Sequence, residues 1–383
     1  RAVDELCDTI NAAMGCEDRD SDAYIRIGSE LSCEEKFRGR LLQNVSTQAT
    51  SREELHEEIE RTRIFVATLA SINGKQELFK LKKFDVAIID EASQILEPQI
   101  VGLLPNFSKF IMIGDHNQLP AIVLQKGWIA AVEEPELRDI GIRSCAYSLF
   151  ERLLHQAMEQ GWEHSYAQLT HQGRMHNDIA LFPSEEYYTE KLLPVSEWQS
   201  EHWNMKPVNS DNVLEQMAAS QRIGFISTER FKHIGVSNKI NKNEAKLVVD
   251  LIAALKHVYE TNGVDLRMGS IGVITPYRNQ IALIRHKLSV SGMDDTDSVM
   301  IDTVERFQGS QRDIIIVSFC VNQPYQLNFL CNMNDKGTVD RKLNVTLTRA
   351  RQQMFLIGNA TVLKRHPIYA TLLEHYKEKT VVL

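Results

Sequence analysis

The run Phe84-Asp85-Val86-Ala87-Ile88-Ile89-Asp90-Glu91-Ala92-Ser93 is the most informative segment of this sequence for fold class. It begins as a short, nearly continuous apolar run and ends in two adjacent carboxylates followed by small residues. Apolar runs of this length are typical of strands buried on both faces, and such strands belong to parallel sheets covered by helices. Because ligand sites gather at the carboxyl ends of such strands, Asp90 and Glu91 are candidate functional residues.

Five further apolar runs repeat this pattern along the 383-residue chain. They lie at residues 64–68, 110–115, 272–275, 314–318 and 355–358. Segments in which apolar residues recur at helical spacing separate the later runs, including one that follows residue 242 and one that follows residue 277. This alternation predicts an α/β protein with two α/β units, the first ending near residue 165.

Three segments outside the apolar runs have their own patterns. Residues 3–14 carry apolar side chains at helical spacing and predict a helix. The charge-rich stretch 16–61 is expected to be a mainly helical insertion that contains one short strand, at 24–27, and a helix whose capping-box spacing begins at Ser51. Residues 183–237 are only weakly periodic, so we expect an irregular insertion there.

The composition is that of an ordinary globular protein, with 43% apolar and 25% charged residues. No apolar run reaches the length of about 18 residues that a membrane span needs, so none is predicted. The six cysteines are scattered without a C-x-x-C pair, which argues against a zinc site and a disulfide framework. We therefore expect a reducing, cytoplasmic location. The net charge of −8 does not indicate a nucleic-acid partner, because phosphate binding depends on where lysines and arginines lie.

Residues suited to phosphate chemistry recur beside the predicted strands. Asp90 and Glu91 could divide the labour, one carboxylate holding Mg²⁺ and the other orienting or deprotonating a water. A glutamine such as Gln118 could sense a γ-phosphate or its attacking water. Arginines such as Arg174 and Arg349 suit phosphates because the planar guanidinium donates two parallel hydrogen bonds. Taken singly, each block has a simpler interpretation, as a solvated acidic pair, a turn or a surface arginine.

Read together and in order, eight blocks resemble the superfamily 1B helicases, most of all the branch of the RNA helicase of nonsense-mediated decay and its bacterial relatives. The blocks are 1–6 (RAVDEL), 66–71 (VATLAS), 90–94 (DEASQ), 114–120 (GDHNQLP), 172–176 (QGRMH), 274–280 (ITPYRNQ), 303–309 (TVERFQG) and 347–351 (LTRAR). The resemblance spans nearly the whole chain. It implies two RecA-like domains, 1–165 and 166–383, each a mostly parallel sheet with helices on both faces, and ATP in the cleft between them.

The resemblance also implies roles for the residues of a nucleotide site. Asp90 would coordinate Mg²⁺ and Glu91 would activate the attacking water. Gln118 would contact the γ-phosphate or that water. Arg174 and Arg349, both from the second domain, would act as arginine fingers on the charge that develops during phosphoryl transfer.

A second set of roles concerns nucleic acid. By the same resemblance, Gln308 and Gly309 would couple the nucleotide to the nucleic acid. The residues implied along a groove for single-stranded DNA or RNA are Thr68, Ser71, Thr275, Pro276, Tyr277 and Thr303. Together the two sets predict an ATP-dependent translocase or helicase that steps along one strand.

Two departures from the family pattern qualify this expectation. The phosphate-binding pattern G-x-x-x-x-G-K-[ST] is absent from the 383 residues, so we expect it upstream of Arg1 and expect this chain to be inactive alone. Gly173 stands where the family often has a tyrosine that can stack on adenine. Stacking from that position is impossible here, which leaves the preference for ATP over other nucleotides open.

Two alternatives to a simple helicase stay open at this stage. The chain could be the motor part of a nuclease–helicase, although no carboxylate cluster for a nuclease is apparent in it. It could also be a helicase-like module that binds nucleic acid without turnover, which the intact candidate site argues against. The sequence does not distinguish DNA from RNA and indicates neither protein partners nor an oligomeric state.

Overall fold

The computed structural model describes residues 2–14, 24–188, 192–231, 239–334 and 336–383. Arg1 and parts of both predicted insertions, 16–61 and 183–237, lie outside the described residues. The chain divides into two compact units, which are described separately. The first comprises residues 1–115 and 120–162, and the second comprises residues 116–119 and 163–383. The short segment 116–119 therefore belongs to the second unit, although its neighbours on both sides belong to the first.

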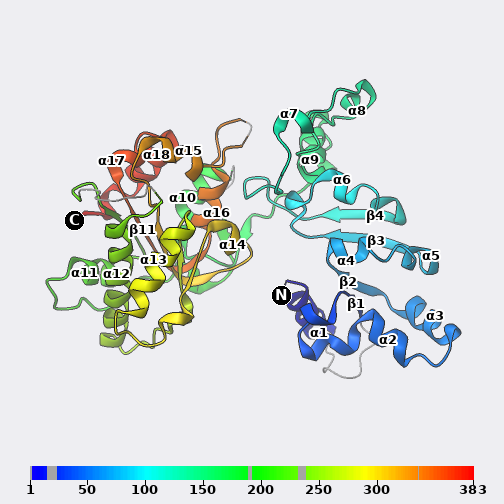
Figure 1. Ribbon diagram of the computed structural model, residues 1–383, viewed down its shortest axis with the longest axis horizontal. Coiled ribbons are helices and arrows are strands. Elements are labelled where there is room, and N and C mark those ends of the chain that lie inside the picture. Colours follow the sequence, from blue (N-terminus) through cyan, green and yellow to red (C-terminus); the bar gives the residue numbers. More distant parts are fainter. Residues whose placement is uncertain (1, 15–23, 189–191, 232–238, 335) are drawn as a thin grey trace. The chain divides into compact units, whose positions relative to one another are not determined.

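The first unit contains two separate pairs of parallel strands, β1–β2 and β3–β4 (Figure 1). Its helices and strands are α1 (Ala2–Met14), β1 (Tyr24–Ile27), α2 (Leu42–Gln48), α3 (Arg52–Arg61), β2 (Ile64–Ala67), α4 (Leu69–Asn73), α5 (Leu78–Leu81), β3 (Phe84–Ile89), α6 (Glu97–Ile100), β4 (Phe107–Met112), α7 (Gly127–Ala130), α8 (Pro135–Asp139) and α9 (Leu149–Gln160). The helix predicted at 3–14 and the strand predicted at 24–27 are confirmed.

The helix predicted to begin at Ser51 is also confirmed, with one difference in its cap. Ser51 Oγ accepts the backbone N–H of Glu54 at 3.1 Å, as the spacing predicts. The Glu54 carboxylate accepts the backbone N–H of Thr50 at 2.6 Å, and hydrogen bonds from the side chain and backbone of Thr50 and from the backbone of Ser51 lower the pKa of Glu54. The cap therefore satisfies the N–H of Glu54, which the first turn of α3 leaves open, and also ties the carboxylate to the residues before the helix.

The prediction that every apolar run is buried on both faces is wrong for β3 and β4. Ile88 of β3 is 69% exposed and Ile111 of β4 is 50% exposed. The physical reason is the lack of a covering layer: among the described residues, β3 and β4 pair only with each other and no α-helix packs along their length, so their faces stay largely open to solvent. An apolar run predicts a strand correctly, but its burial depends on neighbours that the run does not encode.

The second unit is built on one six-stranded parallel sheet in the order β12-β7-β11-β10-β8-β9. Its elements are β5 (His171–Gln172), α10 (Asn177–Tyr187), β6 (Leu193–Pro194), α11 (Val213–Ser220), β7 (Ile223–Ser227), α12 (Lys242–Thr261), β8 (Ile271–Ile274), α13 (Arg278–Ser289), β9 (Met300–Asp302), α14 (Val304–Phe307), β10 (Arg312–Ser318), α15 (Leu327–Leu330), α16 (Arg341–Leu347), β11 (Ala350–Gly358), α17 (Ala360–Leu363), α18 (Pro367–His375) and β12 (Thr380–Val382). This sheet confirms the predicted α/β class.

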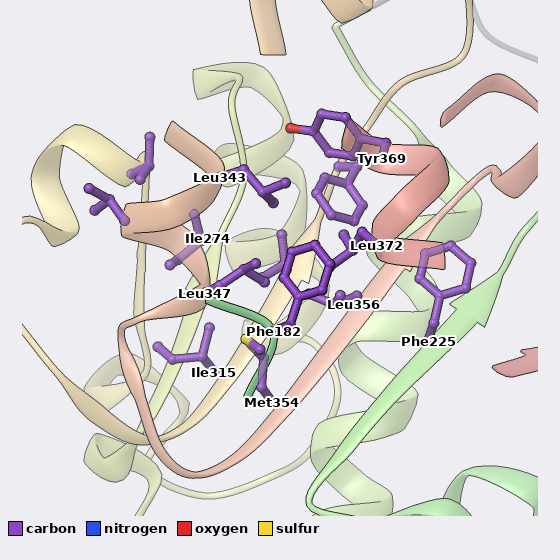
Figure 2. Close-up of a cluster of buried hydrophobic side chains, with 14 of the residues drawn as sticks. Phe182, Phe225, Ile274, Ile315, Leu343, Leu347, Met354, Leu356, Tyr369 and Leu372 are labelled. Atoms are coloured by element: carbon purple, nitrogen blue, oxygen red, sulfur yellow. The ribbon is translucent and has the colours of Figure 1, made fainter. Parts of the chain in front are cut away.

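Both faces of this sheet are covered, so here the prediction of doubly buried strands is confirmed. Along β10, Ile315 joins a core with α10, α16 and α18, and the next residue, Ile316, joins a core with α11, α12 and α13. Figure 2 shows part of the first core, in which Ile315, Leu356 and Phe182 lie together. Burying each such side chain contributes roughly 1.5–3 kcal/mol. The strand ends are therefore held on a rigid frame.

The irregular insertion predicted at 183–237 is the second correction. This stretch contains α11 and β7, and β7 is fully buried between β11 and β12. It also begins inside α10, which continues through Pro183. The apolar run of β7 is only five residues long, and its partners lie more than 100 residues away in sequence, so local periodicity did not reveal it. Within the described ranges, no helix combines the length and apolarity needed to cross a membrane.

Candidate functional site

The acidic candidates lie in a tight turn directly after β3. Glu91 has φ 52° and ψ 34°, a left-handed conformation that non-glycine residues rarely adopt. Asp90 Oδ1 accepts the backbone N–H of Glu91 at 2.9 Å, and the Glu91 carboxylate accepts a hydrogen bond from Gln94. Both carboxylates are exposed, so they remain accessible to a cation or a water.

The end of β4 lies against this turn. The backbone N–H of Ala92 donates to Ile113 O at 2.8 Å. A Cβ at Gly114 would lie 2.9 Å from the backbone nitrogen of Ser93, a distance that side chains essentially never adopt. Ser93 Oγ in turn accepts the backbone N–H of Asp115 at 3.4 Å. Glycine at position 114 therefore permits the close approach that joins the two strand ends.

Thr68 and Ser71 lie after β2 and form a helix cap. Thr68 Oγ1 accepts the backbone N–H of Ser71 at 3.2 Å, and the two hydroxyls lie 2.8 Å apart. The structure therefore brings these two predicted nucleic-acid residues together at an exposed helix start. Capping alone explains their residue types, and two hydroxyls at a helix N-terminus are also suited to a phosphate.

Segment 116–119 accepts hydrogen bonds from two side chains of α16 and from Arg349, which lies two residues after that helix. Arg341 Nε donates to His116 O at 2.9 Å, and Asn344 Nδ2 donates to Asn117 O at 2.8 Å. Arg349 Nη2 donates to Gln118 Oε1 at 3.4 Å. The structure thus brings Gln118 and Arg349 together, although 231 residues separate them in sequence.

The two candidate arginines lie near the amino ends of β10 and β11. Arg349 is only 2% exposed, and its guanidinium also donates to Val345 O at 2.9 Å. Arg174 donates through Nε to Gln311 Oε1 and through Nη1 to Thr348 O, both at 3.2 Å. Both cations are therefore held by neutral acceptors of the second unit, in positions that its sheet fixes.

Gln308 and Gly309 lie between α14 and β10. Gly309 has φ +72°, a backbone conformation that favours glycine. Gln308 Nε2 is buried and has no hydrogen-bond partner among the described residues. A buried amide donor without a partner costs about 1–3 kcal/mol, so an acceptor supplied by a ligand would remove a penalty here.

The remaining candidates lie at the opposite, carboxyl edge of the same sheet. Thr275, Pro276 and Tyr277 line a pocket of about 140 Å³ after β8. Thr275 is fully buried, and its Oγ1 has no hydrogen-bond partner in the described part of the chain. Tyr277 OH accepts from Gln326 Nε2 at 3.2 Å, and burial raises the pKa of Tyr277. Thr303 follows β9 at the same edge, and its backbone N–H donates to Asp302 Oδ1.

Sequence reasoning missed the buried network behind this pocket. Glu244 is fully buried on α12, and its Oε2 accepts from Ser318 Oγ at 2.7 Å and from the backbone N–H of Cys320 at 2.8 Å. Burial raises the pKa of Glu244 to about 7. Asn241, three residues before Glu244, also donates to its carboxylate. That spacing is a capping-box signal, but it did not indicate that the carboxylate reaches β10.

The structure defines an α/β protein that has a carboxylate pair after one strand and arginines near the starts of two others. Two family models, each described as an AAA domain, match residues 145–361 and 2–126. The chain therefore belongs to the superfamily 1 helicases.

The chain is similar to several known proteins, most of which are named as helicases. They include the DNA replication ATP-dependent helicase/nuclease JHS1 of Arabidopsis thaliana (27% identity, 100% of this chain, 26% of that protein). The corresponding DNA2 of Bos taurus is 31% identical over 86% of this chain and 30% of that protein. Regulator of nonsense transcripts 1 of Dictyostelium discoideum is 30% identical over 79% of this chain and 20% of that protein. The chain thus spans 20–30% of the length of these relatives.

Among solved structures, the chain is similar to arterivirus nonstructural protein 10, a helicase, in complex with DNA. That similarity has 11% sequence identity and a TM-score of 0.41, and it covers 97% of this chain and 54% of the other.

Proposed function

We propose that this chain is the motor part of an ATP-dependent translocase that moves along single-stranded nucleic acid. One observation carries the proposal: within the second unit, Arg349 Nη2 donates to Gln118 Oε1 at 3.4 Å. The fold therefore brings together a candidate water-binding glutamine and a candidate arginine finger that come from separate helicase-like blocks of the sequence.

The residues present fit a Mg²⁺–nucleotide site. Mg²⁺ in such sites is held by one or two carboxylates, and waters and phosphates complete its coordination. Asp90 would hold the ion. The described residues contain no group of three or more His, Cys, Asp or Glu side chains placed to share a metal, and a Mg²⁺–nucleotide site does not need one. Bound Mg²⁺ would neutralise charge on the phosphate oxygens. The buried amide of Gln308, which has no partner in the described ranges, is a further donor that a ligand would satisfy.

In this proposal each protein group has one task. Glu91 orients the attacking water and accepts its proton. Gln118 holds that water or a γ-phosphate oxygen. Arg174 and Arg349 donate hydrogen bonds to the oxygens of the transferring phosphoryl group and so stabilise the charge that develops there. Gln308 and Gly309, in the turn before β10, transmit the nucleotide state toward the nucleic acid.

The nucleic-acid groove is assigned to the strand ends that carry hydroxyl groups. Thr275 lines the pocket at the carboxyl edge of the second sheet, and its buried hydroxyl has no partner among the described residues. Thr303 lies at the same edge, and Thr68 and Ser71 lie after β2. Small hydroxyls suit phosphate contacts, which position a strand without reading its sequence. We place the protein in the cytoplasm and assign it DNA or RNA as partner.

The phosphate loop is the part of the site that these 383 residues do not contain. Its backbone N–H groups and lysine would come from elsewhere in the complete protein. This chain alone is therefore expected to hydrolyse ATP far more slowly than about 1 per second, the lower end for phosphoryl-transfer enzymes. A nucleic-acid-stimulated rate at or above that value, free of contaminating ATPase, would contradict this part of the proposal.

The test of the whole proposal is ATP hydrolysis by the complete protein with single-stranded DNA, single-stranded RNA or neither. Stimulation by one of the two strands supports a translocase and identifies whether it moves along DNA or RNA. Arg174→Ala and Arg349→Ala should each lower turnover by about 10³-fold or more if both act as fingers. Strand binding without any turnover would instead support the non-catalytic module.

A second candidate is favoured by the names of the relatives. JHS1 and DNA2 are helicase/nucleases, so the complete protein would also cleave nucleic acid. Since the described residues hold no shared metal site, a nuclease would lie outside them. Cleavage of a labelled single strand by the complete protein, and its persistence in Glu91→Gln, would separate this activity from the motor.

A further inference from the structure

The turn that presents Arg174 is held by two glutamine side chains. Gln172 Oε1 accepts the backbone N–H groups of Arg174 at 3.0 Å and of Met175 at 2.7 Å. Gln199 Nε2 donates to Gln172 O at 2.9 Å and to Met175 O at 2.8 Å, and thus clamps both ends of the turn. Gln199 is fully buried, so its bonds lie in a desolvated setting where they constrain the backbone most.

The guanidinium of Arg174 is held separately from its backbone. Its Nε donates to Gln311 Oε1, and its Nη1 donates to Thr348 O. Gln311 immediately precedes β10 and Thr348 lies two residues before β11, so both acceptors are fixed by the amino ends of neighbouring strands. The bond to Gln311 is exposed, and an exposed hydrogen bond adds little to stability. A stabilising role therefore does not account for it.

We propose that Gln311 is a positioning residue for Arg174, fixing the guanidinium where phosphoryl transfer needs it. This inference rests on the proposed function, in which Arg174 contacts the transferring phosphate. A long arginine side chain has many rotamers, and ordering it in one of them costs conformational entropy. If Gln311 fixes that rotamer before the reaction, this cost is no longer part of the activation barrier. A misplacement of about 1 Å can cost 10²-fold in rate, so one well-placed acceptor is enough to matter.

The test is made in the complete protein with strand-stimulated ATP hydrolysis. Gln311→Met, which keeps the length and removes the acceptor, should lower kcat about 10-fold and leave KM for ATP within about 3-fold. Gln311→Glu keeps an acceptor oxygen at the same reach and should restore most of the rate. Gln216→Met, at an exposed glutamine of α11, is the matched control and should leave kcat unchanged.

Two further measurements separate positioning from a structural role. In Arg174→Ala, adding Gln311→Met should cost nothing more, because the two residues act as one unit. Without nucleotide, the rate at which phenylglyoxal modifies Arg174, mapped by mass spectrometry, should rise in Gln311→Met. A wild-type kcat in Gln311→Met alongside a slow Arg174→Ala overturns the positioning role only. A wild-type rate in Arg174→Ala overturns the proposed function of that arginine as well.

Discussion

At the scale of single residues, the candidate site shows strain and burial where chemistry is proposed. Glu91 is held in a left-handed backbone conformation, which costs of order 1–3 kcal/mol for a non-glycine residue. Such strain persists only where the surroundings impose it, and here the turn is tied to both β3 and β4. The strain supports a functional assignment for Glu91 over a solvated acidic pair.

Glu91→Gln in the complete protein should abolish turnover and spare nucleotide binding. The amide keeps the size and hydrogen bonding of the carboxylate but cannot accept a proton. Loss of a general base lowers turnover by about 10²–10⁴-fold. Steady-state hydrolysis and fluorescent-nucleotide titration measure the two effects. Glu133→Gln, at an exposed glutamate of the same unit, is the control. Equal rates for Glu91→Gln and wild type would remove Glu91 from the site.

Glu244→Gln should stabilise the protein at alkaline pH. The pKa of Glu244 is raised from 4.5 to about 7 by burial, so the unfolded chain loses this proton first as pH rises. The resulting destabilisation is absent below pH 4.5, grows between pH 4.5 and 7, and is complete above 7, where it reaches about 3 kcal/mol. The melting temperature of the variant should therefore exceed that of wild type at pH 8 and match it more closely at pH 5. A pH-independent difference would contradict this assignment.

At the scale of secondary-structure elements, the distances between strand ends determine which side chains meet. The ends of β3 and β4 approach so closely that only glycine fits at position 114. In the second unit, Arg174 and Arg349 lie near the amino ends of β10 and β11. Thr275 and Thr303 follow the carboxyl ends of β8 and β9. Within this unit, the proposed nucleotide-binding and nucleic-acid-binding residues therefore lie at opposite edges of one parallel sheet.

Gly114→Ala should disturb the acidic turn. The added methyl group would meet the backbone of Ser93 at 2.9 Å, so the two strand ends must move apart. Overpacking of this kind costs about 1–3 kcal/mol. We expect a lower melting temperature and a lower kcat in the complete protein. Gly102→Ala, in the same unit with no atom within 4 Å of the added carbon, should change neither. Wild-type values in Gly114→Ala would show that the strand ends can separate freely.

At the scale of the whole molecule, the sequence predicted the helices and strands better than their burial and their partners in the sheet. The run at 314–318 and its helices were predictable because period and apolarity are local, and β10 is buried as expected. The burial of β3 was not predictable, because it depends on what packs over its faces. The strand β7 was missed because its apolar run is short and its partner strands lie far away in the sequence. The site residues could be named from ordered blocks, but the bond between Arg349 and Gln118 follows only from the fold.

Binding of single strands should depend steeply on salt despite the net charge of −8. If cations beside the proposed groove, such as the exposed Arg278 and Arg306, neutralise phosphates, log affinity should fall with log salt by about 0.7 per neutralised phosphate. Base sequence should matter little, because phosphates carry no sequence information. A salt titration with single-stranded and blunt duplex oligonucleotides measures both. A salt-independent affinity, or a preference for duplex, would count against a translocase.

The exposed β3–β4 pair has a consequence for handling the protein in solution. Strands with free edges and apolar faces are templates for pairing with other chains, and here Ile88 and Ile111 face solvent. The 383-residue chain on its own should therefore self-associate as its concentration rises, which static light scattering would detect. Ile88→Lys should suppress the assembly, whereas Leu31→Lys, at an exposed leucine away from these strands, should leave it unchanged. In a longer chain, polypeptide that covered these strands would prevent this self-association.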